Sequence, residues 1–165
     1  MQVIFLPEWL MIISYIILWP MIQILIAMLG NRIDDKHFNP DNLWLKTRKW
    51  EENGLFYKRL LKVHKWKKYL PDGARTHKTG FRKKNLNNYD PEYLKAFISE
   101  TGRAEIFHWL QILPFWIFGL WGPFFVIWIM LAYALIVNMP CIIAQRYNRP
   151  RLMKVYEKAI KNAID

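Results

Sequence analysis

Three polar side chains at the edge of an apolar run are the residues of this sequence best suited to chemistry. Glu105, His108 and Gln111 lie at the start of a stretch that carries no charged residue from Ile106 to Gln145. Glu105 and His108 are spaced i,i+3, which brings two side chains together on one face of a helix. A carboxylate that orients an imidazole makes it an effective general base for a hydroxyl group. We therefore predict that His108 is the catalytic base and that Glu105 orients it.

A second polar set lies where the next apolar run ends. Asn138, Gln145 and Arg149 are spaced by seven and four residues, so they share one face if the helix continues. Arginines such as Arg146 and Arg149 could hold an anionic donor or stabilise developing negative charge. The predicted substrate-binding residues from both sets are Glu100, Arg103, Gln111, Asn138, Gln145, Arg146, Asn148 and Arg149.

Charged and apolar residues are separated into blocks along the sequence. These blocks predict the helices that position the candidate site residues. Of the 165 residues 53% are hydrophobic, yet Lys and Arg number 24 against 13 Asp and Glu. No charge occurs over 9–30 or over 106–145, and a membrane span needs about 20 apolar residues. Gly and Pro over 119–123 favour a turn that divides the second block. We predict an all-α integral membrane protein with about three transmembrane helices, over 9–30, 104–120 and 123–145.

The basic residues predict the orientation of these spans. Eighteen Lys and Arg lie in 31–105 and six in the tail 146–165. The positive-inside rule then predicts a multi-pass protein of the cell membrane, with the N-terminus outside and the C-terminus in the cytoplasm. We expect the first span to be an uncleaved anchor rather than a signal peptide, because no basic residue precedes Arg32 and a small-x-small cleavage pattern is absent.

The segment 31–103 is rich in both aromatic and basic residues, which predicts amphipathic interfacial helices on the cytoplasmic side. One helix is expected over 50–64, with Glu51 on its charged face, followed by Pro71 and a turn at Asp72-Gly73. A second is expected from Asp90-Pro91, with Gly102 separating it from the next span. The whole chain, 1–165, is predicted to be a single membrane domain.

The polar residues of the three predicted spans match in depth. His108, Asn138 and Gln23 each lie a few residues inside the cytoplasmic boundary, on the order of 10 Å deep at about 1.5 Å per residue. We infer a shared polar pocket that opens to the cytoplasm, which a homodimer could help to close. The alternative is that these groups only bond across helices. We favour function for His108, as an intramembrane ionisable residue, and structural bonding for Gln23 and Asn138.

Other functions have weaker support in the sequence. His37 and His64 have no partners at metal-ligand spacing, so no metal site is expected; His77 lies in a basic loop. No nucleic-acid motif occurs, and a basic collar resting on anionic headgroups explains most of the lysines. Cys141 is expected to be a packing residue. Membrane lipids are therefore the expected partners.

Several motifs taken together resemble one enzyme family. They are Gly30-x-Arg32-Ile33-x-Asp35-Lys36-x-Phe38, Lys65-Trp66-Lys67, Asp72-Gly73, Glu100-Thr101-x-Arg103-Ala104-Glu105-x-x-His108-Trp109 and the run from Gln145 to Arg151. In combination, over nearly the whole chain, they resemble the glycosyl-4,4'-diaponeurosporenoate acyltransferases of carotenoid biosynthesis.

The resemblance implies an integral membrane enzyme that transfers a fatty acyl group to a sugar hydroxyl of a glycosylated C30 carotenoid acid, giving a staphyloxanthin-type pigment. It assigns no catalytic residues, so the roles above rest on the residues themselves. We expect acyl-CoA or acyl carrier protein as donor, a lipid-soluble glycosylated acceptor, and no tightly bound cofactor. The alternatives are another lipid-modifying transferase, such as a methyltransferase, and a non-catalytic membrane adaptor that recruits partners through its basic collar.

Overall fold

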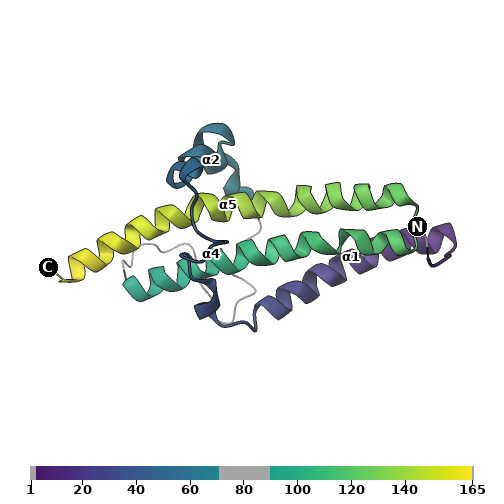
Figure 1. Cartoon of the computed structure of the whole chain (residues 1–165), viewed down its shortest axis with the longest axis horizontal. Coiled ribbons are helices and arrows are strands. Elements are labelled where there is room, and N and C mark those ends of the chain that lie inside the picture. The colour runs from purple at the N-terminus through teal and green to yellow at the C-terminus, as the bar shows by residue number, and fades with distance from the viewer. Residues whose placement is uncertain (1–2, 71–89, 165) are drawn as a thin grey trace. The chain divides into compact units, whose positions relative to one another are not determined.

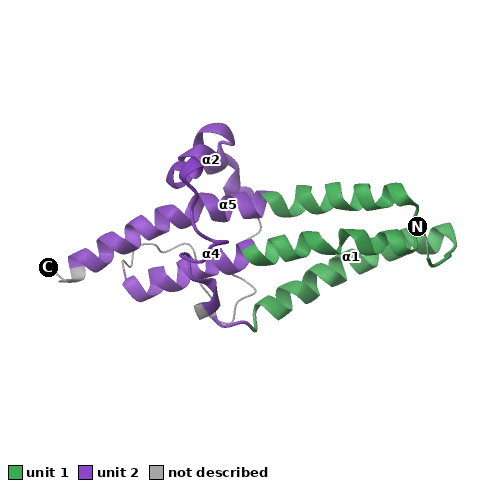
Figure 2. Cartoon of the chain, in the orientation of Figure 1, with its two compact units in different colours: residues 1–32, 106–139 green, residues 33–105, 140–165 purple. Residues whose placement is uncertain are grey.

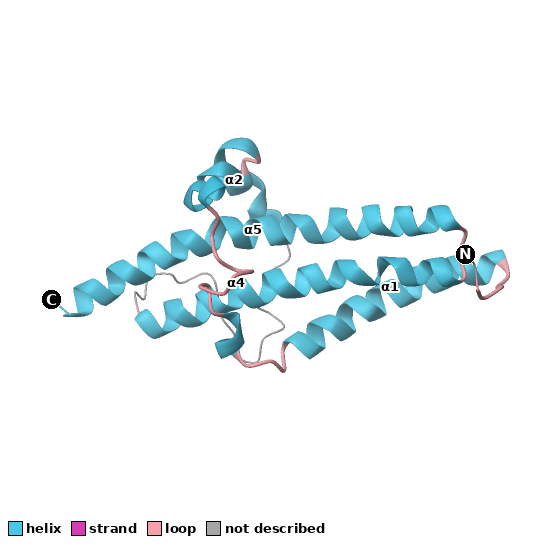
Figure 3. Cartoon of the chain, viewed as in Figure 1, coloured by secondary structure: helices cyan, strands magenta, loops and turns pink. Residues whose placement is uncertain are grey.

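The computed structural model describes residues 3–70 and 90–164, and every regular element within them is a helix (Figure 3). The long helices are α1 (Glu8–Gly30), α4 (Pro91–Ile112) and α5 (Phe124–Ile164) (Figure 1). The short ones are η1 (Asp35–Phe38), η2 (Lys49–Gly54), α2 (Leu55–Leu60), α3 (Val63–Trp66), η3 (Lys67–Tyr69) and η5 (Leu113–Leu120). The all-α class is thereby confirmed for the described residues. The expected features at Pro71, Asp72-Gly73 and His77 lie outside them.

Two helices, α1 and α5, are long and apolar enough to cross a membrane. They contain the predicted span 9–30 and residues 124–145 of the predicted span 123–145. The predicted span 104–120 is helical too, but it changes from α-helix to 3-10 helix after Ile112. Pro114 at the start of η5 accounts for the change, because proline lacks the amide hydrogen that an α-helix interior requires.

The described chain forms two compact units (Figure 2). Unit 1 comprises residues 1–32 and 106–139, and unit 2 comprises residues 33–105 and 140–165. Helices α4 and α5 each contribute one segment to each unit.

Unit 1 is an aromatic-centred packing of α1, η5 and the first part of α5. The Phe118 side chain is fully buried, and its ring lies 5.6 Å from that of Trp19 and 5.8 Å from that of Tyr15. Only Trp19 and Gly30 of the 23 residues of α1 are buried. Such a large exposed apolar surface is unfavourable in water, so unit 1 requires an apolar surrounding such as lipid.

Unit 2 packs its short helices and the first part of α4 against the C-terminal part of α5. One cluster of buried side chains joins Tyr57 and Val63 to Tyr147 of α5, and another joins Phe97 and Ile98 of α4 to Leu152 of α5. Residues far apart in sequence are thus joined through α5, which contacts both residues 57–63 and residues 97–98.

The expected continuous helix over 50–64 is wrong, because the backbone reverses twice within it. Residues 52–54 have positive φ, as does Lys62, and these positions separate η2 from α2 and α2 from α3. Gly54 has φ 89° and leaves room for the Tyr147 carbonyl, which would lie 2.9 Å from a Cβ at this position. Packing against α5 therefore overrides the amphipathic pattern.

The expected break at Gly102 is also wrong. Helix α4 begins at Pro91, as predicted, with the Asp90 carboxylate accepting a hydrogen bond from the Glu92 amide at 3.1 Å. It then continues through Gly102 to Ile112. A Cβ on Gly102 would lie 2.8 Å from the Leu45 side chain and 3.1 Å from the Phe38 carbonyl. The glycine therefore serves close packing of the 38–45 segment on α4, not helix termination.

We predict that Gly102→Val destabilises the protein by about 1–3 kcal/mol, because the added side chain overlaps Leu45 and the Phe38 backbone. Thermal unfolding of the detergent-solubilised protein, followed by tryptophan fluorescence, measures the effect. Lys95→Val adds the same β-branched side chain at an exposed position of the same helix and serves as control. Equal melting temperatures for the two variants would show that Gly102 does not mediate this packing.

Candidate active site

The site in unit 1 is centred on His108 of α4. Its Nδ1 lies 2.9 Å from Oδ1 of Asn138 on α5, and the Asn138 Nδ2 donates to the Ala134 carbonyl at 3.0 Å. Because the NH₂ group of Asn138 is directed at Ala134, its carbonyl oxygen faces the imidazole, and Nδ1 must be the donor. A neutral imidazole with its proton on Nδ1 has its lone pair on Nε2. The arrangement therefore presents Nε2 of His108 as a base.

Two glutamines extend this polar cluster to α1. The Gln23 Nε2 donates to the Gln111 carbonyl at 2.9 Å, and the Gln111 Nε2 donates to the Gln23 carbonyl at 3.1 Å. Hydrogen bonds thus join α1 to α4 and α4 to α5 within unit 1, and the shared polar pocket stays a prediction. Asn138 has 1% of its surface exposed, and each polar atom of its amide has one hydrogen-bond partner, in the helix or on the imidazole.

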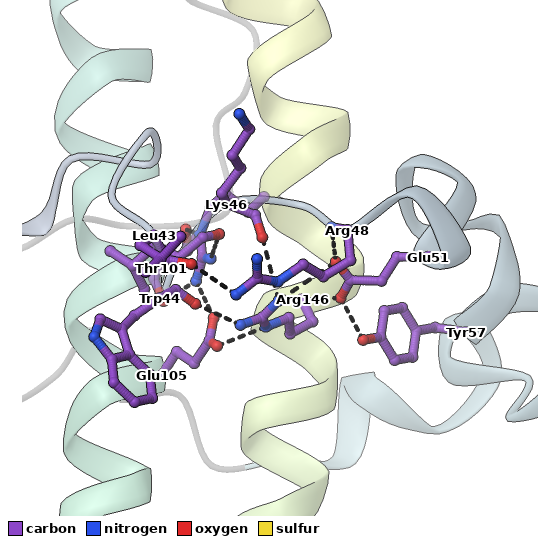
Figure 4. A network of polar contacts seen from close by, with 11 residues as sticks. Leu43, Trp44, Lys46, Arg48, Glu51, Tyr57, Thr101, Glu105 and Arg146 are labelled. Carbon is purple, nitrogen blue, oxygen red and sulfur yellow. Dashed lines mark hydrogen bonds and ion pairs between the residues drawn. The ribbon is translucent and has the colours of Figure 1, made fainter.

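Unit 2 contains a buried ion network centred on Glu105 (Figure 4). One oxygen of this carboxylate accepts a hydrogen bond from Nε of Arg146 at 2.6 Å, and the other accepts from Nη2 of Arg149. Glu105 and Arg149 are each only 1% exposed. A buried charge is strongly unfavourable without a partner, so the two guanidinium groups and the carboxylate depend on each other.

Glu51 supplies the second carboxylate of this network. Its oxygens lie 3.3 and 3.4 Å from Nη1 of Arg146, and one accepts a hydrogen bond from the Tyr57 hydroxyl at 2.5 Å. Two arginines thus meet two carboxylates, so the buried formal charge is balanced. Burial, with the hydrogen bond to Glu51 as a second cause, raises the pKa of the Tyr57 phenol, which keeps it a hydrogen-bond donor at neutral pH. The expectation that Glu51 lies on a charged outer face is wrong, since it is fully buried.

The other hydrogen bonds of the two arginines go to backbone carbonyls and to the Thr101 hydroxyl. Arg149 donates to the Leu45 carbonyl at 2.7 Å and to Thr101, at its carbonyl (3.0 Å) and its hydroxyl (3.1 Å). Arg146 donates to the Trp44 carbonyl at 2.6 Å. Through these bonds Arg146 and Arg149 position the backbone of residues 44–45 and helix α4 against α5. Donor binding by Arg146 and Arg149 stays a prediction, and their hydrogen-bonding capacity is largely used by the protein.

The other predicted substrate-binding residues lie in unit 2. Arg103 binds Glu100 at 2.6 Å and the Ile33 carbonyl at 3.1 Å. Asn148 accepts a hydrogen bond from Nζ of Lys67 at 2.7 Å, and Gln145 is partly buried on α5. The orientation of His108 by Glu105 stays a prediction; within unit 1 the residue that holds the imidazole is Asn138.

Glu51 and Tyr57 are the network residues that sequence reasoning missed. Glu51 lies beside Glu52 in a stretch rich in Lys and Arg, so its periodicity suggested a solvated position. One signal was available: two arginines on a helix that enters an apolar segment require two carboxylates, and Glu105 supplies only one. Within residues 3–70 and 90–164, no group of three or more His, Cys, Asp or Glu could hold a metal ion.

The structure is that of a helical, membrane-associated protein with a polar cluster around His108. A family model for glycosyl-4,4'-diaponeurosporenoate acyltransferases matches residues 41–158. Proteins of that name from Staphylococcus aureus strains bovine RF122 / ET3-1, MRSA252 and USA300 are each 39% identical to this chain over 137 residues, covering 83% of this chain and 82% of the relative. No solved structure matches.

The chain belongs to the glycosyl-4,4'-diaponeurosporenoate acyltransferase family, and it is an acyltransferase. The methyltransferase and the non-catalytic adaptor that the sequence also allowed are therefore set aside.

We predict that Glu105→Gln destabilises the protein by about 3–5 kcal/mol, because it leaves Arg149 buried without its counter-charge. Thermal unfolding in detergent measures the loss. Glu157→Gln, which removes the same charge at an exposed position of α5, is the matched control. Adding Arg149→Met to Glu105→Gln should recover part of the loss. If Glu105→Gln unfolds at the temperature of the control, the ion pair does not support the fold.

Proposed function

We propose that this enzyme transfers a fatty acyl group from an activated donor to a sugar hydroxyl of a glycosylated C30 carotenoid acid, or of a similar glycolipid, at the inner leaflet. Family membership supports the reaction class and the acceptor. The single observation that carries the mechanism is the pairing of His108 with Asn138, because it holds the proton on Nδ1 and so puts the basic lone pair on Nε2.

In this mechanism the His108 Nε2 removes the proton of the acceptor hydroxyl while its oxygen attacks the thioester carbonyl carbon. The tetrahedral intermediate collapses with cleavage of the carbon–sulfur bond, and the imidazolium returns the proton to the departing thiolate. Asn138 accepts the Nδ1 hydrogen throughout, which fixes the ring orientation and stabilises the imidazolium. The products are the acyl ester and the free thiol.

The proposed enzyme crosses the membrane three times, with its N-terminus outside and its C-terminus in the cytoplasm. Support comes from the length and apolarity of α1 and α5 and from the restriction of every Lys and Arg to residues 31–105 and 146–165. Segment 104–120, built from the end of α4 and η5, is the proposed middle span.

The short helices of unit 2 are proposed to rest in the headgroup region. Large apolar and aromatic side chains are exposed there, among them Trp44, Trp50, Leu60 and Tyr69, and tryptophan and tyrosine favour membrane–water interfaces. This location would bring a cytosolic donor, acyl-CoA or acyl carrier protein, to a lipid-soluble acceptor. A homodimer stays a prediction.

We predict that His108→Ala lowers the rate of acyl transfer to the glycosylated carotenoid by about 10²–10⁴-fold, the usual contribution of general-base catalysis. Acylated product is measured by mass spectrometry in membranes that contain equal amounts of each variant. His64→Ala, at an exposed histidine of unit 2, should retain full activity. Full activity of His108→Ala would exclude the mechanism.

Substitutions of Asn138 test whether this residue orients His108 or serves only helix packing. Asn138→Asp keeps an acceptor for the Nδ1 hydrogen and should retain more activity than Asn138→Leu, which keeps the volume and loses the acceptor. Their melting temperatures show whether both variants fold. Equal activity in folded proteins would show that Asn138 does not orient His108.

Cysteine labelling tests the topology on a Cys141→Ser background, which removes the single native cysteine. We predict that a membrane-impermeant maleimide labels Phe5→Cys and Pro123→Cys in intact cells, since both positions are exposed and proposed to lie outside. Lys95→Cys and Lys158→Cys should react only after the membrane is permeabilised. Labelling of Pro123→Cys with the same dependence as Lys95→Cys would overturn the middle span.

A further inference from the structure

A basic cleft in unit 2, separate from the ion network, has no role in the reaction described above. It has a volume of about 290 Å³ and lies between the turn that joins η2 to α2 and one face of α5. Its wall is formed by Gly54 and Lys58 on one side and by Tyr147, Arg151 and Lys154 on the other.

All the charged side chains that line this cleft are positive. Lys58, Arg151 and Lys154 line it, and none of the described residues that line it is a carboxylate. The acidic residue nearest in sequence to this turn, Glu52, is ion-paired with Arg59. Three cations without a facing carboxylate repel one another, and an anion in the cleft would relieve that repulsion.

The cleft is held in shape by contacts at its base. Tyr147 is 2% exposed, and its carbonyl packs against Gly54, whose left-handed backbone allows the close approach. The Tyr147 hydroxyl accepts a hydrogen bond from Nη1 of Arg151, and the Arg151 guanidinium lies 4.8 Å from the centre of the tyrosine ring. Arg151 is therefore oriented before any ligand binds, which lowers the entropic cost of binding.

Positive charge continues from the cleft along α5. Lys158 and Lys161 follow Arg151 by seven and ten residues, which places all three on the face of the helix that also carries Lys154. Both lysines are exposed. A ligand that carries several phosphates, rather than one, would match a cleft extended by such a stripe.

We propose that this cleft binds phosphate groups, and that the ligand carrying them is the nucleotide end of a coenzyme A thioester that acts as acyl donor. Arginine and lysine are the side chains that bind phosphate, arginine through a planar pair of N–H groups. A concave site of this size accommodates a phosphate group and part of a nucleotide. The donor role rests on the proposed function, whereas nucleotide binding is measurable without it.

Direct binding tests the site on the full chain in phosphatidylcholine nanodiscs, with coenzyme A and adenosine 3',5'-bisphosphate as probes in calorimetry. The variant Lys58→Ala/Arg151→Ala/Lys154→Ala should bind both probes at least about tenfold more weakly. The matched control, Lys49→Ala/Lys65→Ala/Lys95→Ala, removes the same charge from exposed positions of unit 2 outside the cleft and should bind as the unmodified protein does. The single variant Lys154→Glu, at an exposed position, gives the same test if the triple variant does not fold.

Three outcomes would overturn the proposal. An equal loss in the control variant would show a general electrostatic effect. Unchanged coenzyme A affinity with weaker association to phosphatidylglycerol vesicles would assign the cleft to lipid headgroups. Unchanged coenzyme A affinity with weaker binding of acyl carrier protein would assign it to that protein.

Kinetics separate this inference from the proposed reaction. In the acyl-transfer assay the cleft variant should raise KM for acyl-CoA about tenfold or more and change kcat less than about twofold. Active enzyme with an unchanged KM would overturn the cleft and leave the reaction standing. Loss of nucleotide binding in the cleft variant, in a protein that shows no acyl transfer, would support the cleft and overturn the reaction.

Discussion

The buried ion pair between Glu105 and Arg149 is the interaction on which unit 2 depends. Both groups are almost fully buried, and a charge in that setting is tolerated only with a partner and with its hydrogen bonds satisfied. Arg149 meets both conditions through Glu105, Thr101 and the Leu45 backbone. The network therefore determines where the segment that follows α1 is held against α5.

The outer surface of unit 1 is apolar. Its polar groups therefore need hydrogen-bond partners within the unit. Gln23, Gln111, His108 and Asn138 bond to one another or to helix carbonyls. In an apolar surrounding an unmade hydrogen bond costs several kcal/mol, so this cluster both joins the helices and fixes the tautomer of His108. One arrangement thus serves helix association and, in the proposed mechanism, catalysis.

Much of the fold follows from patterns that act locally along the chain. Long uncharged runs predict α1 and α5, and Asp90-Pro91 predicts the start of α4, because apolarity and capping are properties of neighbouring residues. Depth along each run also predicts which polar residues of unit 1 meet. The predictions of a continuous helix over 50–64 and of a break at Gly102 were wrong. Close contact with Tyr147 in the first case and with Leu45 in the second determines the backbone conformation.

The sequence by itself determined the helical class, the apolar helices, the family and the candidate base, because each depends on residue type and spacing. Only the tertiary structure decided the partners: Asn138 for His108, two arginines for Glu105, and a buried position for Glu51. The i,i+3 spacing of Glu105 and His108 predicts that their side chains interact, but it does not identify the partners that α5 supplies to each. Helical periodicity reports the direction of a side chain around its own axis, whereas the identity of its partner depends on which helix packs on that side.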